Sequence, residues 1–212
     1  SREGSTLKIT DPDGILYDVP SMYSSTIGNV RTIAKTNRNY SPLATFWYIG
    51  KTNQYTGDGI NSSLSSIGNG RQVIVDLIDN NTSLTPDVSF ALTNDNTLSA
   101  TGGKLDVRKG QFIETNSARV TGNAAYILGS TGTLYMSPGT LYKIVQGYST
   151  LTTESGSSGG TYIPRMLGST FAYTLTGGTI ELAGTGASHV FQTLRGGRTY
   201  KNINFSGTNS TY

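Results

Sequence analysis

The chain has 212 residues, of which 35% are hydrophobic and 14% charged, and its formal net charge is +3. Because it contains 27 glycines, 13 tyrosines and no cysteine, it lacks both the charge-rich, aromatic-poor composition of a disordered chain and the thiols of a disulfide framework or thiolate metal site. Its 16 basic residues are scattered and no apolar run approaches the roughly 18 residues of a membrane span, so we expect neither nucleic-acid binding nor a transmembrane helix.

Short runs of β-forming residues, separated by turns rich in Gly, Asn and Ser, recur along the whole chain. In order they occupy residues 7–9, 46–49, 72–78, 104–107, 111–113, 125–128, 133–136, 171–175, 179–182 and 201–205. Almost nothing between them has the apolar spacing of a helix. Many short strands with glycine punctuation predict an all-β protein, with longer turns over 79–87 and 155–160.

A loose internal repeat favours one all-β architecture over another. Residues 45–56 and 179–190 share an order of Thr, a short strand, Gly, a polar turn and a second strand start. Such phrases recur every ~20–25 residues, at the low end of solenoid repeat lengths, which predicts about nine coils. We therefore expect residues 1–212 to be a single right-handed parallel β-helix (a β-solenoid), an internal segment of a longer protein.

The competing architecture is a β-sandwich or jelly roll, which is built from antiparallel hairpins. The pairs Gly102-Gly103 and Gly177-Gly178 are typical of the tight turns that close such hairpins. The direction in which neighbouring strands pair distinguishes the two architectures.

The last third of the chain, GGTIELAGTGASHVFQTLRGGRTYKNINFSGTNSTY (177–212), carries a pattern of fixed order. It resembles a phrase of very large secreted surface proteins of Bacteroidota, approximately G-T-[IV]-E-[FLY]-x-G-[TS]-G-x-Q-x-[VI], a short gap, then Y-x-N-[LI]-x-[LIF]-S-G. The chain departs from this phrase at Ser188, where the family often has Gln. The positions that match are Gly178, Thr179, Ile180, Glu181, Leu182, Gly184, Thr185, Gly186, Tyr200, Asn202, Ile203, Phe205, Ser206 and Gly207.

The opening segment is similar to the other phrase of the same family. GSTLKITDPDGIL (4–16) is followed by SSTIGNVRTI (24–33), as "L-x-I-T-x-x-x-G-I" precedes a short "G-N-[IV]-x" strand in that family. The resemblance implies a parallel β-helix, export by the type IX secretion system and an extracellular or cell-surface location. It also implies secretion or anchoring machinery at the outer membrane as a partner, and some relatives resemble gliding or adhesion filaments.

The densest aromatic group suggests a contact with carbohydrate. In strand alternation Phe46 and Tyr48 share one face and Trp47 takes the other. If Phe46 and Tyr48 point inward, Trp47 is exposed and can stack on a sugar ring, with Tyr40 and Tyr55 nearby in sequence. The alternative is an aromatic cluster that fills the core of a wide coil.

Two acidic residues form the one weak metal candidate. Asp11 and Asp13 frame a glycine turn, and close carboxylates suit Ca²⁺. The spacing of a calcium-binding loop is absent, and a plain turn in which Asp caps its own backbone explains the same residues. We therefore expect no cofactor, with Ca²⁺ at Asp11 and Asp13 as the alternative.

Catalytic residues are not expected. His189 is the single histidine and has no neighbouring nucleophile in sequence. A glycoside hydrolase needs two carboxylates at ~5–10 Å. Asp76 with Asp79, or Asp87 with Asp95, are the pairs that adjacent coils could bring together, but no strand holds an Asp-x-Asp pattern.

These features predict a non-enzymatic structural and adhesive segment of a secreted surface protein, with polar or glycan contacts on its outer faces. One alternative is a β-helix polysaccharide lyase or glycoside hydrolase, which a cleft lined by Asp with Lys or Arg on one parallel sheet would favour. Another is a segment of a phage tail-spike or fibre, which trimerisation would support.

Overall fold

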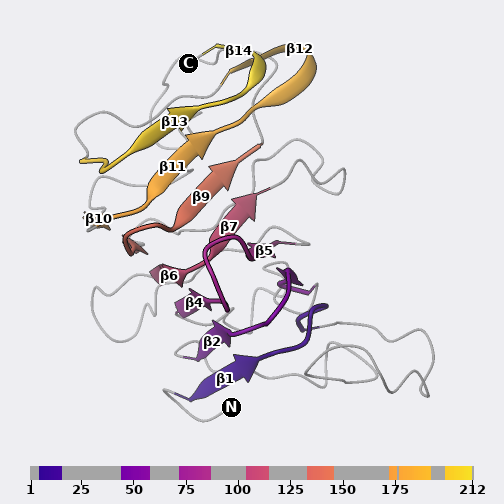
Figure 1. Ribbon diagram of the computed structural model, residues 1–212, viewed down its shortest axis with the longest axis vertical. Coiled ribbons are helices and arrows are strands. Elements are labelled where there is room, and N and C mark those ends of the chain that lie inside the picture. Colours follow the sequence, from indigo (N-terminus) through magenta and orange to yellow (C-terminus); the bar gives the residue numbers. More distant parts are fainter. Residues whose placement is uncertain are drawn as a thin grey trace, which may run out of the picture.

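The computed structural model describes residues 5–15, 44–57, 72–86, 104–114, 133–145, 172–175, 177–191 and 199–211, and these ranges contain strands, turns and loops but no helix (Figure 1). The described strands are β1 (Thr6–Ile9), β2 (Thr45–Tyr48), β3 (Gln54–Tyr55), β4 (Gln72–Asp76), β5 (Ser83–Thr85), β6 (Lys104–Lys109), β7 (Gln111–Glu114), β8 (Thr133–Met136), β9 (Leu141–Ile144), β10 (Ala172–Leu175), β11 (Thr179–Leu182), β12 (Thr185–Phe191), β13 (Ile203–Phe205) and β14 (Thr208–Thr211). The predicted all-β class is confirmed for this part of the chain. The predicted strand at 125–128 lies outside it.

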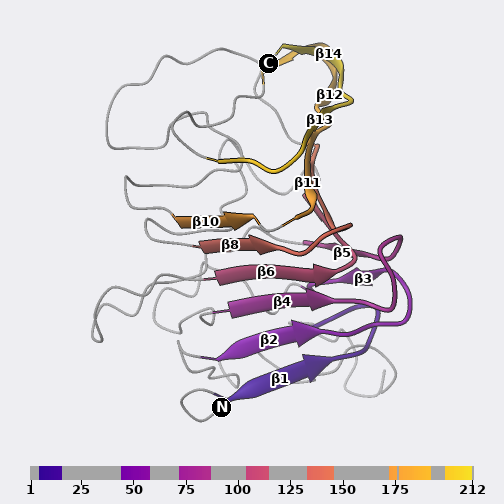
Figure 2. The ribbon, with the colours of Figure 1, turned by 60° about the vertical axis from the view of Figure 1, so that its left-hand side comes forward.

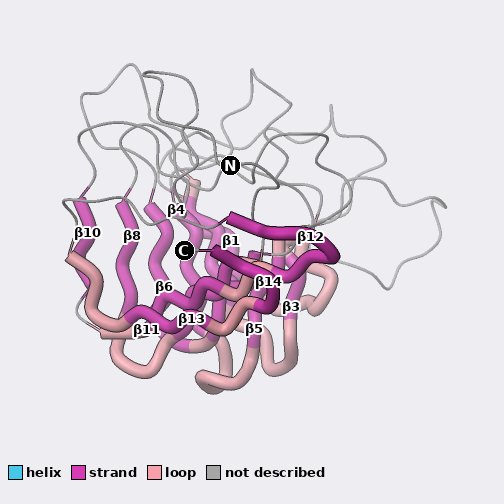
Figure 3. The backbone as a smooth tube through the Cα atoms, turned by 90° about the horizontal axis from the view of Figure 1, so that it is seen from above, coloured by secondary structure: helices cyan, strands magenta, loops and turns pink. Residues whose placement is uncertain are grey.

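Two parallel sheets make up most of the described structure. Sheet A has the order β1-β2-β4-β6-β8-β10 and sheet B the order β13-β11-β9-β7-β5-β3. From β2 to β11 the chain alternates between the sheets, so that each sheet A strand leads into a sheet B strand, and we call such a pair a layer. Figure 2 shows the sheet A strands stacked in chain order, and Figure 3 shows the turns that join the two sheets gathered along one side. This arrangement is consistent with a β-solenoid.

All the strand pairs in the described residues are parallel. The alternative of an antiparallel sandwich is therefore wrong for this part of the chain. Gly177 and Gly178 do not close a hairpin, because they join β10 in sheet A to β11 in sheet B. The pair Gly102-Gly103 lies outside the described residues.

The expected repeat length and number of coils are wrong. In sheet A, Thr6 pairs with Thr45 and Thr45 pairs with Gln72, and both of these intervals are longer than the expected repeat. Among the described residues, sheet A has six strands, whereas nine coils were expected. Each layer holds two short strands, such as β6 and β7, and the long segments between layers make the repeat longer than the sequence phrase.

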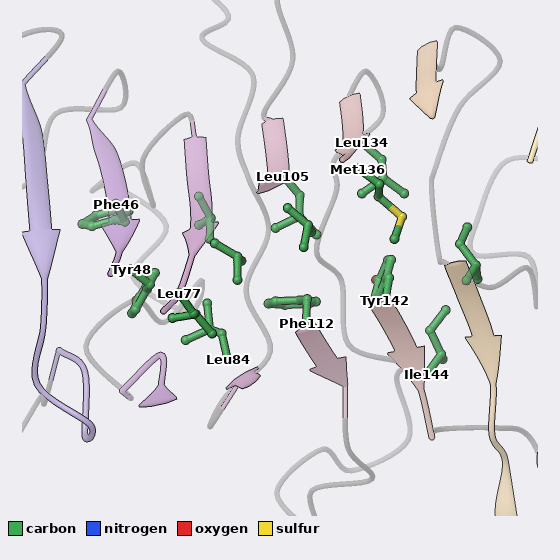
Figure 4. Packing of buried hydrophobic residues seen from close by; sticks show 14 of the residues in the cluster. Phe46, Tyr48, Leu77, Leu84, Leu105, Phe112, Leu134, Met136, Tyr142 and Ile144 are labelled. Atoms are coloured by element: carbon green, nitrogen blue, oxygen red, sulfur yellow. The ribbon is translucent and has the colours of Figure 1, made fainter. Parts of the chain in front are cut away.

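The core lies between the sheets, where inward side chains stack in columns (Figure 4). In β2, Phe46 and Tyr48 are fully buried while Trp47 is only partly so. In parallel strands that pair in register, inward side chains of one strand lie beside inward side chains of the next. For example, the ring of Phe112 contacts the ring of Tyr142 edge to face, with 5.4 Å between the ring centres. Two inward columns of sheet A are Leu7, Phe46, Val73, Leu105 and Leu134, and Ile9, Tyr48, Val75, Val107 and Met136.

Amide side chains tie the turns of successive layers together. The Gln54 carbonyl accepts a hydrogen bond from Gly50 N at 2.8 Å, and its amide donates to the carbonyls of Ile9 and Asp11 at 3.3 and 2.8 Å. Further along, Asn53 accepts from the backbone N–H of Ser83 at 3.0 Å. Asn80 does the same for Gly110, also at 3.0 Å. These bonds satisfy backbone groups that the corners remove from the sheet ladders.

Replacing Gln54 with alanine is expected to lower the free energy of unfolding by about 1–3 kcal/mol. Gln54 is 1% exposed, and its loss removes the partner of the buried Gly50 N–H, which costs roughly 1–3 kcal/mol. The carbonyls of Ile9 and Asp11 keep their hydrogen bonds from Ile49 N and Gly14 N. Chemical denaturation followed by circular dichroism measures the loss. Gln72→Ala on the outer face of β4 is the control. Equal effects of the two substitutions would contradict the role of Gln54.

The apolar columns of sheet B end at an exposed strand. β13 pairs with β11 and continues its inward positions, with Ile203 beside Ile180 and Phe205 beside Leu182. Ile180 and Leu182 are 1% exposed, whereas Ile203 is 40% and Phe205 54% exposed. A separate pair, β12 and β14, lies beyond β13 at the C-terminal end (Figure 1).

Candidate functional site

The structure separates the aromatic residues that the sequence analysis grouped together. Trp47 lies on the outward face of sheet A, between the inward-facing Phe46 and Tyr48, so the predicted alternation is confirmed. Tyr55 is 49% exposed but belongs to β3 in sheet B. Tyr40 lies outside the described residues. Trp47 and Tyr55 therefore sit on different sheets and do not form one aromatic surface.

Trp47 instead belongs to an outward column that crosses sheet A. The strand registers place Lys8, Trp47, Ile74, Asp106 and Tyr135 side by side on β1, β2, β4, β6 and β8. Ile74 is only 5% exposed although it points outward. The longer polar and aromatic side chains around it therefore leave little of the sheet uncovered.

Cations lie over both aromatic rings of this column. Lys8 Nζ is 4.7 Å from the centre of the Trp47 ring, and the Arg108 guanidinium carbon is 5.7 Å from the same ring. Lys104 Nζ is 4.0 Å from the centre of the Tyr135 ring. An aromatic face attracts a cation within about 6 Å, so these contacts hold three long cationic side chains against the sheet.

Two carboxylates complete the surface. Asp106 is 7% exposed, and its Oδ2 is 3.1 Å from Lys104 Nζ and 3.0 Å from Arg108 Nε. The indole N–H of Trp47 donates to Asp76 Oδ2 at 3.3 Å. A buried carboxylate requires partners of this kind. We refer to the whole set as the sheet A stripe, which consists of Lys8, Trp47, Asp76, Lys104, Asp106, Arg108 and Tyr135.

Most of the sheet A stripe was not predicted from the sequence, although one signal was present. Lys104, Asp106 and Arg108 alternate along a single strand, so their side chains share one face. Neither Tyr135 nor Lys8 could be added to them from the sequence, because the neighbours across the sheet depend on which strands pair.

Asp11 and Asp13 form a turn that satisfies its own backbone. The N–H of Asp13 donates to Asp11 Oδ1 at 3.0 Å, and that of Gly14 donates to the Asp11 carbonyl at 3.1 Å. The same carbonyl also accepts from Gln54. In the part of the chain that the structure describes, no three His, Cys, Asp or Glu side chains gather as a metal site would require. A calcium ion at this turn remains a prediction.

The structure gives Asp76 and Asp79 different surroundings. Asp76 lies in the sheet A stripe, whereas Asp79 Oδ1 accepts hydrogen bonds from the Thr82 hydroxyl and from the N–H groups of Asn81 and Thr82. The Thr82 hydroxyl and these N–H groups lower the pKa of Asp79. Asp79 therefore caps the turn before β5. Asp87 and Asp95 lie outside the described residues, and His189 lies on β12.

One acidic residue occupies the core of sheet B. Glu114 lies in an inward column beside Ile144 and is 5% exposed. Its Oε1 accepts a hydrogen bond of 2.5 Å from the Tyr142 hydroxyl. Burial raises the pKa of Glu114 to about 7, and the hydrogen bond from Tyr142 opposes part of this rise. The alternation of Gln-Phe-Ile-Glu in β7 already placed Glu114 on the same face as Phe112, but the sequence analysis did not use it.

The outer face of sheet B carries a further ion pair. Lys143 Nζ lies 2.8 Å from Glu181 Oε1 across β9 and β11. The hydroxyl of Ser206 donates to the same oxygen at 2.6 Å. Burial raises the pKa of Glu181, but the hydrogen bonds from Lys143, Ser206 and Asn204 together bring it below its ordinary value. This cluster joins three layers of sheet B.

The described residues define the class of the protein as all-β, with two parallel sheets and a charged, aromatic outer stripe on one of them. A comparison of the chain with models of protein families, with curated proteins and with solved structures found no match. Among the described residues there is also no helix that is long and apolar enough to span a membrane.

Proposed function

We propose that the chain is a right-handed parallel β-helix that serves as a non-enzymatic structural and adhesive segment of a large secreted cell-surface protein. The observation that carries this proposal is the continuous parallel ladder, in which each sheet A strand bonds to the strand of the next layer from β1 to β10. In a solenoid each repeat contacts its neighbours, so stacking extends one stiff body along its axis. Such a rod holds its outer faces, including the sheet A stripe, away from the cell.

The proposed export route is the type IX secretion system, with secretion or anchoring machinery at the outer membrane as the partner. Its support is the resemblance of residues 4–16 and 177–212 to secreted surface proteins of Bacteroidota. The exposed Ile203 and Phe205 at the end of sheet B add a physical argument. Exposed apolar side chains that continue the buried columns of a sheet form a surface that further strands or a partner would cover.

Surface display is the expected result that tests this function. Antibodies raised against the chain should label intact cells of the species that produces it, and the label should disappear when type IX secretion is inactivated. An outer-membrane protein with known exposure and a periplasmic protein are the controls. Labelling that appears only after the cells are permeabilised would contradict the proposal.

A second candidate function is the turnover of polysaccharide. The observation that favours it is the presence of Asp76, Asp106, Lys104 and Arg108 on the outer face of one parallel sheet. If this surface is catalytic, the chain should release unsaturated or reducing sugar ends from polysaccharides, and Asp106→Asn should abolish the release. Intact polysaccharide after prolonged incubation with the folded chain would favour the adhesive role.

A further inference from the structure

We propose that the sheet A stripe binds an acidic polysaccharide, which is a polymer of sugar rings that carry carboxylate or sulfate groups. This inference rests on the proposed adhesive function and names the class of its ligand. The ligand's anions would contact Lys8 and Arg108, whose side chains lie over the Trp47 ring.

Two cations of the sheet A stripe, Lys8 and Arg108, are available to contact a ligand. Lys8 has no ion pair with the described residues, and its ammonium lies over Trp47. Arg108 uses Nε for Asp106, and within the described part of the chain its two terminal nitrogens donate no hydrogen bond. The Arg108 side chain is 43% exposed. A guanidinium with free donors is suited to a carboxylate or sulfate group.

The cationic side chains of the stripe are already held in place before a ligand binds. Lysine and arginine normally lose much rotamer freedom when they bind a ligand. Here Lys8 and Arg108 already lie against Trp47, and Lys104 lies against Tyr135 and Asp106. Because part of that freedom is lost on folding, less of it opposes binding. The two aromatic rings therefore serve to hold the charged side chains in place.

The sheet A stripe extends along the axis of the stack. Trp47 and Tyr135 lie on β2 and β8, three steps apart in sheet A, and neighbouring strands lie about 4.8 Å apart, so these two residues are separated by roughly 14 Å. Lys8 and Arg108 lie over the Trp47 ring and Lys104 lies over the Tyr135 ring. A polymer that runs across the strands can therefore reach the cations at both rings.

The charge of the sheet A stripe favours a sparsely charged polymer over nucleic acid. The stripe contains three cations and two carboxylates, a net charge of +1. Strong binding to a nucleic-acid backbone requires many uncompensated cations, because its affinity comes from phosphate neutralisation. Asp76 and Asp106 would repel such a dense row of phosphates. Binding to DNA is accordingly an outcome that contradicts the proposal.

Matched pairs of polymers test the proposal with the 212-residue chain. Binding should be measured by affinity electrophoresis or biolayer interferometry with a lightly sulfated dextran against dextran, and with polygalacturonate that is esterified at most of its rings against its fully methyl-esterified form. We expect binding to at least one charged member, at least tenfold weaker binding to its neutral counterpart, and weakening at high salt. Whether the carboxylated or the sulfated polymer binds identifies the anionic group.

Variants then locate the site. The double variant K8Q/R108Q should weaken binding at least tenfold, while Lys51→Gln, which removes a charge from an exposed turn between β2 and β3, should leave it unchanged. Circular dichroism and thermal unfolding establish that each variant is folded. Equal binding by K8Q/R108Q and the parent chain, stronger binding to single-stranded DNA, or no preference for the charged polymers would overturn the inference.

The two proposals fail in different ways. Cells that display the chain while it binds no acidic polymer would overturn the ligand class and leave the surface function standing. A chain that binds acidic polymers through the sheet A stripe but stays inside the cell would overturn the surface function and leave the binding site standing.

Discussion

Replacing Gly57 with alanine is expected to lower the free energy of unfolding by about 4 kcal/mol. Gly57 has a φ of +75°, which costs an L-residue roughly 1–3 kcal/mol. A Cβ atom there would also lie 2.2 Å from the Ile15 carbonyl oxygen and 2.4 Å from its carbon and nitrogen. These are backbone atoms, so no side-chain rotation relieves the clash.

The clash would separate the segment around Ile15 from the segment around Gly57, which belong to the first layers of the stack. Ile15 N donates a hydrogen bond of 3.0 Å to the carbonyl of Thr56, next to Gly57. Gly14 makes the reciprocal approach, since a Cβ on it would lie 2.3 Å from the Tyr55 carbonyl oxygen. Separation of the two segments breaks this backbone pairing and exposes Ile15, which is now fully buried. A loss of this size is a large fraction of the roughly 5–15 kcal/mol that stabilises a typical domain.

Gly139 offers a matched control for this prediction. Its φ is +80°, but the nearest atom to an added Cβ is Asn80 Nδ2 at 2.7 Å, which is a side-chain atom rather than backbone. Gly139→Ala should therefore cost about 2 kcal/mol, for the backbone conformation and for moving the Asn80 side chain, whose Oδ1 accepts a hydrogen bond from Gly110 N. Urea denaturation of both variants provides the comparison. Equal losses would show that the close approach at Gly57 does not limit the packing of the layers.

Replacing Glu114 with glutamine is expected to stabilise the protein above neutral pH and to leave its stability nearly unchanged at pH 4. Burial raises the pKa of Glu114 from its ordinary 4.5 to about 7. The folded protein therefore favours the protonated carboxyl. The contribution of Glu114 to the free energy of unfolding is highest below pH 4.5, falls as the pH rises toward 7, and levels off above that. A shift of this size corresponds to about 3 kcal/mol at pH 8.

Two variants separate the Glu114 charge from other titrating groups. Tyr142→Phe removes the hydroxyl that donates to the Glu114 carboxylate, so it should destabilise the protein more at pH 8 than at pH 4. Glu181→Gln alters a carboxyl whose pKa is lowered, so its cost should appear above the ordinary pKa of Glu and vanish as the pH falls through the lowered value. Unfolding curves in urea from about pH 2 to pH 8 measure all three variants. Parallel pH dependence of the parent chain and Glu114→Gln would refute a buried, titrating Glu114.

Strand positions were predictable where the sequence carried a strong local signal. Residues 133–136 and 179–182 form strands with the predicted bounds. β5 was not predicted, because Asp79 and the asparagines after it signal a turn and the strand itself has only three residues. It forms because Leu84 stacks on Phe112 of the next layer. β9 was also missed, although Leu-Tyr-Lys-Ile has the alternation of a half-buried strand.

The sequence by itself determined which residues of a strand share a face, because successive side chains point to opposite faces whatever the neighbours are. That rule placed Phe46 and Tyr48 on one face and Trp47 on the other, and the structure shows that Phe46 and Tyr48 are on the buried face. Only the tertiary structure decided what lies beside Trp47, because Lys8 and Arg108 belong to other strands, β1 and β6, that are distant from it in the chain. Parallel pairing across such intervals depends on how layers stack and register, which local sequence does not encode. The sheet A stripe and the burial of Glu114 against Tyr142 both arise from that stacking.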